Sequence, residues 1–197
     1  QRVRLWNALR EHQWCGHLRE LDRRDGPYGI HLNEVNDCRV GNNTVDGLAH
    51  CLYATSVYDA IIDSNAFSDA GVDGMYISSI GSSNITICNN SVIGADVALN
   101  LINARDTVIT GNVLRNFSQY GIMAWTSEGA VLENNTCQGQ GLGYGIELNE
   151  CDGAVIRGCN ITMCYEGVRI SQSASASIMD TNSSHNLNNG LVVGSGS

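Results

Sequence analysis

The stretch that decides the fold is YGIHLNE, Tyr28–Glu34, which returns with one substitution as YGIELNE at Tyr144–Glu150. When the chain is aligned on the Ile that follows the Gly, the same apolar position recurs at intervals of 22 to 24 residues. This first inward column comprises Ile30, Leu52, Met75, Leu99, Ile122, Ile146, Val168 and Leu191. The quoted stretch is therefore one turn of a repeat, not a duplicated active site.

Two further positions repeat with the same period. An apolar residue follows two positions later and points to the same side, because side chains alternate along a strand. This second inward column comprises Leu32, Ala54, Ile77, Leu101, Ala124, Leu148, Ile170 and Val193. A turn asparagine then recurs as Asn43, Asn65, Asn90, Asn112, Asn135 and Asn182, with Cys159 in the seventh row. Each unit thus contains three short β-rich runs separated by Gly, Asn, Ser and Asp turn residues.

A unit of this length is too small to bury its own apolar face, so neighbouring units must stack. We predict a coil in which each strand pairs in parallel with its equivalent one turn away. Buried turn asparagines then hydrogen-bond one another as a ladder. The pattern resembles the right-handed parallel β-helix repeat family, the pectin-lyase-like superfamily, from Tyr28 to about Gly194. The resemblance implies an all-β solenoid of about seven coils of about 23 residues.

Residues 1–27 do not follow the repeat, and we predict that they form an N-terminal capping segment before a β-helix at 28–197. An open solenoid end exposes strand edges and must be covered. The alternative is a degenerate extra coil, since Cys15 lies 23 residues before Cys38. The chain stops one strand into a coil at GLVVGSGS, so we expect further sequence or another subunit to cover that end. An amphipathic helix in the capping segment would align Val3, Leu5, Trp6 and Leu9.

The charge balance excludes several classes of partner. Lys is absent, and 20 acidic residues face 11 basic ones for a net charge of −9. Nucleic acids and anionic membranes need clustered basic residues, so neither is expected. No apolar run approaches the ~20 residues of a membrane span. The chain opens with Gln and shows no secretion signal, so we expect a removed leader or a longer parent protein. The resemblance implies a secreted or cell-surface location.

The eight cysteines do not share columns of the repeat, as bridges between neighbouring coils would require. We therefore predict small buried thiols with two disulfides at most. The segment HQWCGH brings His12, Cys15 and His17 close together. Its spacing matches no established zinc pattern and a fourth ligand is missing, so no metal site is predicted.

Families with this fold bind or cut polysaccharides along an outward strand face, and the resemblance places a candidate site there. His31, Tyr53 and Tyr76 lie between the two inward columns. Asn33, Thr55 and Ser78 follow directly after the second column. Aromatic rings pack on sugar rings, while amides and hydroxyls bond sugar hydroxyls. His31 is the predicted base if chemistry occurs, because imidazole exchanges a proton near neutral pH.

An alternative cluster on the same face consists of Trp125, Glu147 and Arg169. Glu147 and Arg169 occupy equivalent positions of adjacent coils, which favours a cross-strand ion pair. With about 4.8 Å between coils, Arg169 lies roughly 29 Å from His31, so the two clusters cannot share one reaction.

Known enzyme signatures are incomplete. Tyr28–Glu34 is similar to the alginate-epimerase motif, but the central Asp-Pro-His of that motif is replaced at positions 31–33. The segment NTVDG at 43–47 is similar to the Asn-Thr-Asp-Gly of polygalacturonases with Val45 inserted. The segment RIS at Arg169–Ser171 lacks the Lys of their Arg-Ile-Lys motif.

The sequence therefore predicts a β-helix scaffold that binds or processes polysaccharide along its outward face. As an enzyme it would be a lyase, an epimerase or a glycoside hydrolase. No cofactor is expected, with calcium as the exception, because a chain without Lys needs a metal to neutralise a uronate near Tyr76. The alternative is a non-catalytic structural or interaction solenoid, such as a surface-protein or fibre segment.

Overall fold

The chain winds as a right-handed parallel β-helix of about seven coils, each contributing about 23 residues. The structure is a computed structural model, and it describes residues 27–194 apart from the side chains of residues 80–82. Within those residues there are strands and turns but no helix. The predicted capping helix lies outside the described residues, so the boundary between 1–27 and 28–197 stays a prediction.

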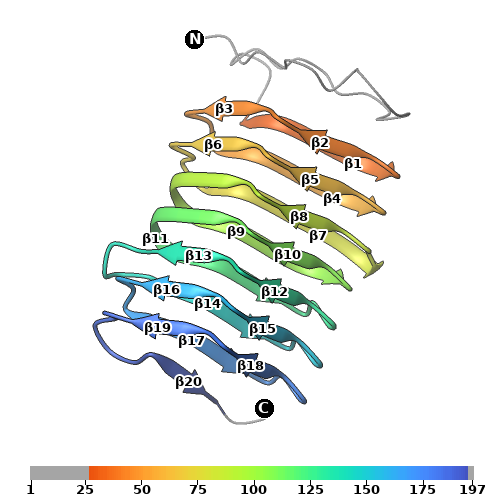
Figure 1. The fold of residues 1–197 in the computed structure, drawn as a ribbon. Coiled ribbons are helices and arrows are strands. Elements are labelled where there is room, and N and C mark those ends of the chain that lie inside the picture. Colours follow the sequence, from red (N-terminus) through yellow and green to blue (C-terminus); the bar gives the residue numbers. More distant parts are fainter. Residues whose placement is uncertain (1–26, 195–197) are drawn as a thin grey trace.

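Each coil contains three strands (Figure 1). The first strands are β1 (Tyr28–Asn36), β4 (His50–Tyr58), β7 (Asp73–Ser82), β14 (Tyr144–Asn149), β17 (Glu166–Ser171) and β20 (Leu191–Val193). The second strands are β2 (Arg39–Gly41), β5 (Ile61–Asp63), β8 (Thr86–Cys88), β10 (Val108–Thr110), β12 (Val131–Glu133), β15 (Val155–Arg157) and β18 (Ser177–Met179). The third strands are β3 (Thr44–Asp46), β6 (Ala66–Ser68), β13 (Thr136–Gln138), β16 (Asn160–Thr162) and β19 (Asn182–Ser184). In the middle of the solenoid a third strand continues into the next first strand, giving β9 (Ser91–Arg105) and β11 (Val113–Trp125).

Every strand pairs in parallel with its equivalent in the neighbouring coil. The second strands form a seven-stranded sheet, while the first and third strands join through β9 and β11 into a thirteen-stranded sheet. Ile30 pairs with Leu52, and Leu32 pairs with Ala54. These pairs begin two inward columns that continue through β20. The predicted period, pairing direction and both inward columns are therefore confirmed.

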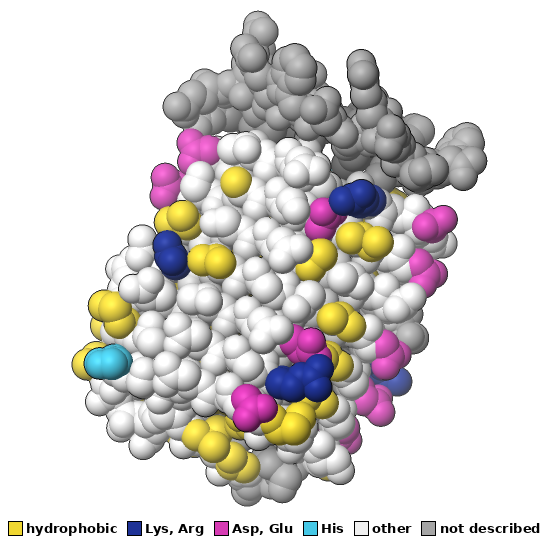
Figure 2. Space-filling model, viewed as in Figure 1, with side chains coloured by type: hydrophobic (Ala, Val, Ile, Leu, Met, Phe, Trp, Pro, Cys, Tyr) yellow, Lys and Arg dark blue, Asp and Glu magenta, His cyan; other side chains and the backbone are white. Residues whose placement is uncertain are grey.

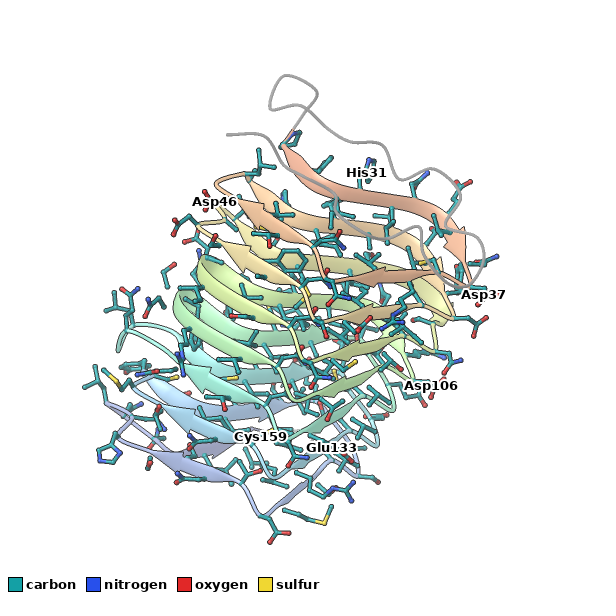
Figure 3. The ribbon with its side chains drawn as sticks, turned by 45° about the horizontal axis from the view of Figure 1, so that its top comes forward. His31, Asp37, Asp46, Asp106, Glu133 and Cys159 are labelled. Carbon is teal, nitrogen blue, oxygen red and sulfur yellow. The ribbon has the colours of Figure 1, made fainter. Side chains whose placement is uncertain are left out.

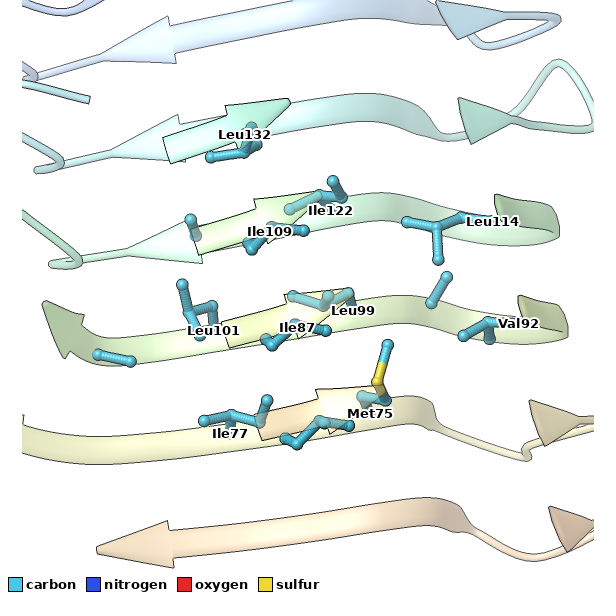
Figure 4. Close-up of a cluster of buried hydrophobic side chains, with 14 of the residues drawn as sticks. Met75, Ile77, Ile87, Val92, Leu99, Leu101, Ile109, Leu114, Ile122 and Leu132 are labelled. Carbon is cyan, nitrogen blue, oxygen red and sulfur yellow. The ribbon is translucent and has the colours of Figure 1, made fainter. Parts of the chain in front are cut away.

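The core is a stack of aliphatic layers along the axis (Figure 4). Met75, Leu99 and Ile122 lie one above another and are fully buried, as are Ile87 and Ile109 of the second-strand sheet. Burial of this kind is the dominant stabilising term, roughly 25 cal/mol per Å² of apolar surface removed from water. The inward columns end at β20, where Leu191 and Val193 are 51% and 60% exposed.

A column of buried asparagines runs parallel to the core at the turn before the third strands. The side-chain amide of Asn43 donates to Asn65 Oδ1 at 2.9 Å, and the same bond repeats in the rows that follow. Each amide from Asn65 onward also donates to a main-chain carbonyl of the preceding coil, as Asn90 does to Ile62 O at 2.9 Å. These bonds satisfy polar groups that would be costly to bury alone. The members, all at most 2% exposed, are Asn43, Asn65, Asn90, Asn112 and Asn135.

The turn itself depends on the residue that precedes each asparagine. That residue has a positive φ in every row, for example 58° at Asn42 and 64° at Gly111. Asn, Asp and Gly tolerate this left-handed region best, and these residue types dominate the position. The recurring Asn-Asn and Gly-Asn pairs of the sequence therefore mark the corner between the second and third strands.

Asn182 does not belong to this column, and its assignment from the sequence is wrong. Asn182 is exposed, pairs with Asn160 in the strand register, and donates to the Asn160 side chain at 2.9 Å. The row after Cys159 is occupied by Thr181 instead. The column of buried amides thus ends at Asn135, whose side chain lies 3.9 Å from Cys159 Sγ.

The surface in Figure 2 is dominated by uncharged groups, and its basic side chains are few. On the second-strand sheet, Arg39 binds Asp63 through two hydrogen bonds of 2.7 and 2.9 Å. Arg157 pairs with Glu133 on the same sheet. These charges are satisfied by neighbouring coils, so they form no free basic patch.

All seven cysteines of the described segment are free thiols, in agreement with the register argument. Six are buried, whereas Cys88 is partly exposed. Burial raises the pKa of Cys51 to about 12 and that of Cys164 to about 11. Among the seven described cysteines, we expect iodoacetamide to label the partly exposed Cys88 first in the native protein and the six buried thiols only after unfolding, because the reactive form is an accessible thiolate. Peptide mass spectrometry would measure this order, and rapid native labelling of Cys51 would contradict it.

Candidate functional site

The outer side of the first-strand sheet, called the outward face below, carries three columns of side chains. The His31 column contains His31, Tyr53, Tyr76, Asn100, Met123, Glu147 and Arg169. The Asn33 column contains Asn33, Thr55, Ser78, Ile102, Trp125, Asn149 and Ser171. The Tyr28 column contains Tyr28, His50, Asp73, Val97, Tyr120, Tyr144 and Glu166. The first two columns have the predicted membership, and the third was not anticipated.

Three tyrosines stack on one another at the first three coils. The ring centroids of Tyr28 and Tyr53 are 4.3 Å apart, and those of Tyr53 and Tyr76 are 4.7 Å apart with the planes inclined by only 8°. Both faces of the Tyr53 ring are thus covered by neighbours. A ligand on this face meets the ring edges and hydroxyl groups of the stack, not the open ring face that the sequence suggested.

His31 is exposed on β1, the first strand of the solenoid (Figure 3). Its ring contacts Tyr28 and Tyr53 at centroid distances of 5.0 and 5.7 Å. In the part of the chain that the structure describes, no carboxylate lies within ion-pair distance of His31. The structure thus brings His31, Tyr53 and Tyr76 together as predicted, but it gives His31 no group to orient its imidazole.

The polar residues beside the stack are partly bonded to one another. Thr55 donates to Asn33 Oδ1 at 2.8 Å across neighbouring coils. Asn33 is exposed, and Thr55 and Ser78 are half-buried. Asn33, Thr55 and Ser78 are direct register partners in successive coils, so their polar groups form one column beside the tyrosine stack.

A histidine–carboxylate pair lies behind the stack in the Tyr28 column. His50 Nδ1 is 2.9 Å from Asp73 Oδ2, with side-chain exposures of 17% and 4%. Asn100 donates to the other carboxylate oxygen at 3.1 Å. Burial raises the pKa of Asp73, while Asn100 and His50 act in the opposite direction. The pair therefore holds a buried carboxylate next to an imidazole at the edge of the outward face.

The alternative cluster is also assembled. Trp125 Nε1 donates to Glu147 Oε2 at 3.4 Å, and Arg169 Nε is 4.0 Å from Glu147 Oε1, at the outer limit of an ion pair. Arg169 also donates to the Tyr144 hydroxyl at 3.1 Å and lies 5.3 Å from its ring centroid. Burial, followed by the charge of Glu147, raises the pKa of Tyr120. Arg169 therefore contacts both the Glu147 carboxylate and the Tyr144 side chain, and it does not pair with Glu147 alone.

The described part of the chain offers no cluster of three or more His, Cys, Asp or Glu residues able to hold a metal ion. Burial raises the pKa of the Cys137 and Cys159 thiols. The segment with His12, Cys15 and His17 lies outside the described residues. A helix able to cross a membrane is likewise missing from residues 27–194.

The fold and its side-chain columns define the class of protein. It is a right-handed parallel β-helix whose outward face carries three columns of side chains. Residues 17–196 match the family model described as periplasmic copper-binding protein (NosD). The chain belongs to this family. Residues 27–194 contain no cluster of donor groups that fits the copper named in the family description. A search of curated proteins gave no match.

Solved structures support the same fold. A double mutant of the periplasmic alginate epimerase AlgG matches with a TM-score of 0.67 and 17% identity over 73% of this chain and 34% of that chain. A single mutant of the same epimerase matches with a TM-score of 0.67 and 18% identity over the same shares. The Streptococcus pneumoniae surface protein and adhesin PfbA matches with a TM-score of 0.47 and 13% identity over 83% and 68%. This chain spans about a third of the epimerase chains that it matches.

Proposed function

We propose that the chain is a periplasmic or extracellular β-helix that binds a polysaccharide along its outward face. The observation that carries the proposal is the continuous edge formed by the stacked Tyr28, Tyr53 and Tyr76 with Asn33 and Thr55 beside it. Phenol hydroxyls and an amide can hydrogen-bond sugar hydroxyls, and the aromatic ring edges add apolar contact area. The columns run along the solenoid axis, so the ligand would be an extended chain lying across several coils.

The charge of the face indicates a neutral or weakly charged polymer. Arg169 is the one Arg or Lys residue in the three described columns, and Glu147 and Tyr144 already contact it. A net charge of −9 repels polyanions at low ionic strength. Trp125, which is 41% exposed, offers a second aromatic contact about two coils beyond the tyrosine stack.

The comparisons supply a context for this proposal. A family described as periplasmic and a fold neighbour named as a periplasmic alginate epimerase favour a compartment where polysaccharide is present. The epimerase activity itself is not carried over, because the Asp-Pro-His of the motif is replaced at positions 31–33.

A second candidate function is a purely structural or interaction solenoid. It is favoured by the way outward polar groups satisfy one another across coils, as Ser171 does with Asn149 at 2.9 Å and Ser68 with Asp46 at 2.8 Å. Such pairs stabilise the stack without any ligand. This candidate predicts that the isolated protein binds no glycan.

The test is a glycan array with the soluble protein, followed by the double substitution Tyr53→Ala and Tyr76→Ala. Two lost aromatic contacts, at about 0.5–1.5 kcal/mol each, should raise the Kd by roughly 5-fold to 140-fold. Tyr58→Ala, at the end of β4 and outside the three columns, is the matched control and should leave the Kd unchanged. Unchanged affinity in a folded double variant would move the site away from the stack, and an array without binding would favour the structural solenoid.

A further inference from the structure

The His50–Asp73 pair is a feature that polysaccharide binding alone does not require. The two residues are the first of β4 and of β7, and they are direct partners in the strand register. Both side chains are largely buried, and Asn100 holds the second carboxylate oxygen of Asp73. A buried carboxylate is costly unless its charge is used or neutralised, so the sequence maintains this pair against a free-energy penalty.

The geometry leaves one nitrogen of His50 for a ligand. Nδ1 lies 2.9 Å from Asp73 Oδ2, close enough for strong attraction although the N–H is not aligned as a regular hydrogen bond. A carboxylate at Nδ1 favours the tautomer with the proton on that nitrogen. Nε2 then carries the lone pair and is the atom able to take a proton from a bound molecule.

The surroundings of the imidazole are phenolic. The rings of Tyr28, Tyr53 and Tyr76 lie 5.4, 5.3 and 6.2 Å from the ring of His50. Burial raises the pKa of Tyr53, so its hydroxyl stays protonated and remains a hydrogen-bond donor at neutral pH. Among the described residues, Asp96 also acts on the charge of Asp73, and His31 on β1 contacts the rings of Tyr28 and Tyr53.

We infer that His50, positioned by Asp73, is a general base that hydrolyses a neutral carboxylic ester carried by a saccharide on the outward face. The inference rests on the proposed polysaccharide binding for its substrate class. A neutral ester suits the site, because the columns at the first three coils contain no Arg or Lys to hold an anionic substrate. Phenol hydroxyls are suitable donors for the oxyanion that forms when an ester carbonyl is attacked.

The step balances with water as the only co-reactant. Nε2 of His50 removes a proton from water as the water oxygen bonds to the ester carbonyl carbon. The carbonyl oxygen becomes an oxyanion that accepts hydrogen bonds from tyrosine hydroxyls. The bond from that carbon to the sugar oxygen then breaks, and the proton on Nε2 passes to the leaving alkoxide. The products are a carboxylic acid and the free sugar hydroxyl.

The test measures release of 4-nitrophenolate from 4-nitrophenyl acetate and of acetate from O-acetylated xylan. The rate should fall in acid, because a protonated imidazole cannot act as a base. His50→Gln should lower both rates by ~100-fold, the lower end of the range for a general base. His185→Gln is the matched control and should change them less than about twofold, because His185 is exposed, follows β19 and lies outside the three columns of the outward face. Asp73→Asn should lower the rates and displace the pH profile, which a purely structural role would not do.

Folding of each variant is checked by circular dichroism. If His50→Gln does not fold, diethyl pyrocarbonate treatment of the native protein replaces it, with mass spectrometry to follow each histidine. Loss of activity that tracks modification of His50 supports the inference. Loss that tracks His31, or native rates no higher than those of equimolar free imidazole, overturns it. Hydrolysis of 4-nitrophenyl acetate without release from acetylated xylan overturns the substrate class, whereas absence of both activities with retained glycan binding overturns only the catalytic role.

Discussion

Replacing Asn90 by alanine is expected to lower the free energy of unfolding by about 2–6 kcal/mol, since each of two buried groups left unpaired costs about 1–3 kcal/mol. The Asn90 side chain accepts from both the main chain and the side chain of Asn65, and donates to Ile62 O and to Asn112. Its removal leaves the main-chain N–H of Asn65 and one N–H of the Asn65 side chain without the acceptor that they share inside the solenoid. Urea unfolding followed by circular dichroism would measure the change.

Asn182→Ala is the matched control for this substitution. Asn182 occupies the neighbouring position of the last complete turn, is exposed, and donates to the exposed Asn160 side chain. Its loss should change the free energy of unfolding by less than about 0.5 kcal/mol, as for most surface positions. Equal effects at Asn90 and Asn182 would show that the buried amide column contributes no special stability.

Gly145→Ala should destabilise the protein by about 3 kcal/mol, at the upper end of the usual cost of overpacking. A Cβ at position 145 would lie 2.6 Å from the carbonyl oxygen of Gly167 and would also collide with the side chain of Ile161. The carbonyl belongs to the next coil and is fixed by the parallel sheet, so it cannot move aside without breaking strand pairing. The midpoint of thermal unfolding would report the loss.

Gly71→Ala serves as the control for this second substitution. A Cβ there would be 3.8 Å from its nearest neighbour, the Cα of Ala49, which is an ordinary contact. The expected change is within about 1 kcal/mol and stabilising if anything, because alanine restricts the unfolded chain. A neutral Gly145→Ala variant would mean that the coils separate more easily than their packing indicates.

The fold could be predicted because one period determines both the pairing and the packing. The coils differ in length by only one or two residues, so aligning the repeats predicts which residues of successive first strands are partners, as for Ile30 and Leu52. The error at Asn182 has a local cause. The segment Asp180–Ser184 offers an asparagine one residue after the correct position, and residue type was followed where the repeat length pointed to Thr181.

The candidate site was only partly predictable because strand alternation fails at its first residue. Gly29 and Ile30 both face the interior, where a Cβ on Gly29 would meet the Val45 side chain. This irregularity turns Tyr28 outward, although strict alternation from Ile30 would place it inside. His50 and Asp73 share that position, so they were missed together with the tyrosine stack. The sequence position directly before the recurring Gly, as at Tyr28 and Asp73, could have predicted this column.

The direction of the hydrogen bonds has a mechanical consequence. The strand pairs and the amides of the asparagine column all join one coil to the next, so these bonds lie along the solenoid axis. Tension along the axis would pass through every coil boundary in turn, so the boundary with the fewest bonds would open first. Force across the axis would load many boundaries together in shear. A protein of this build resists sideways load far better than lengthwise stretching.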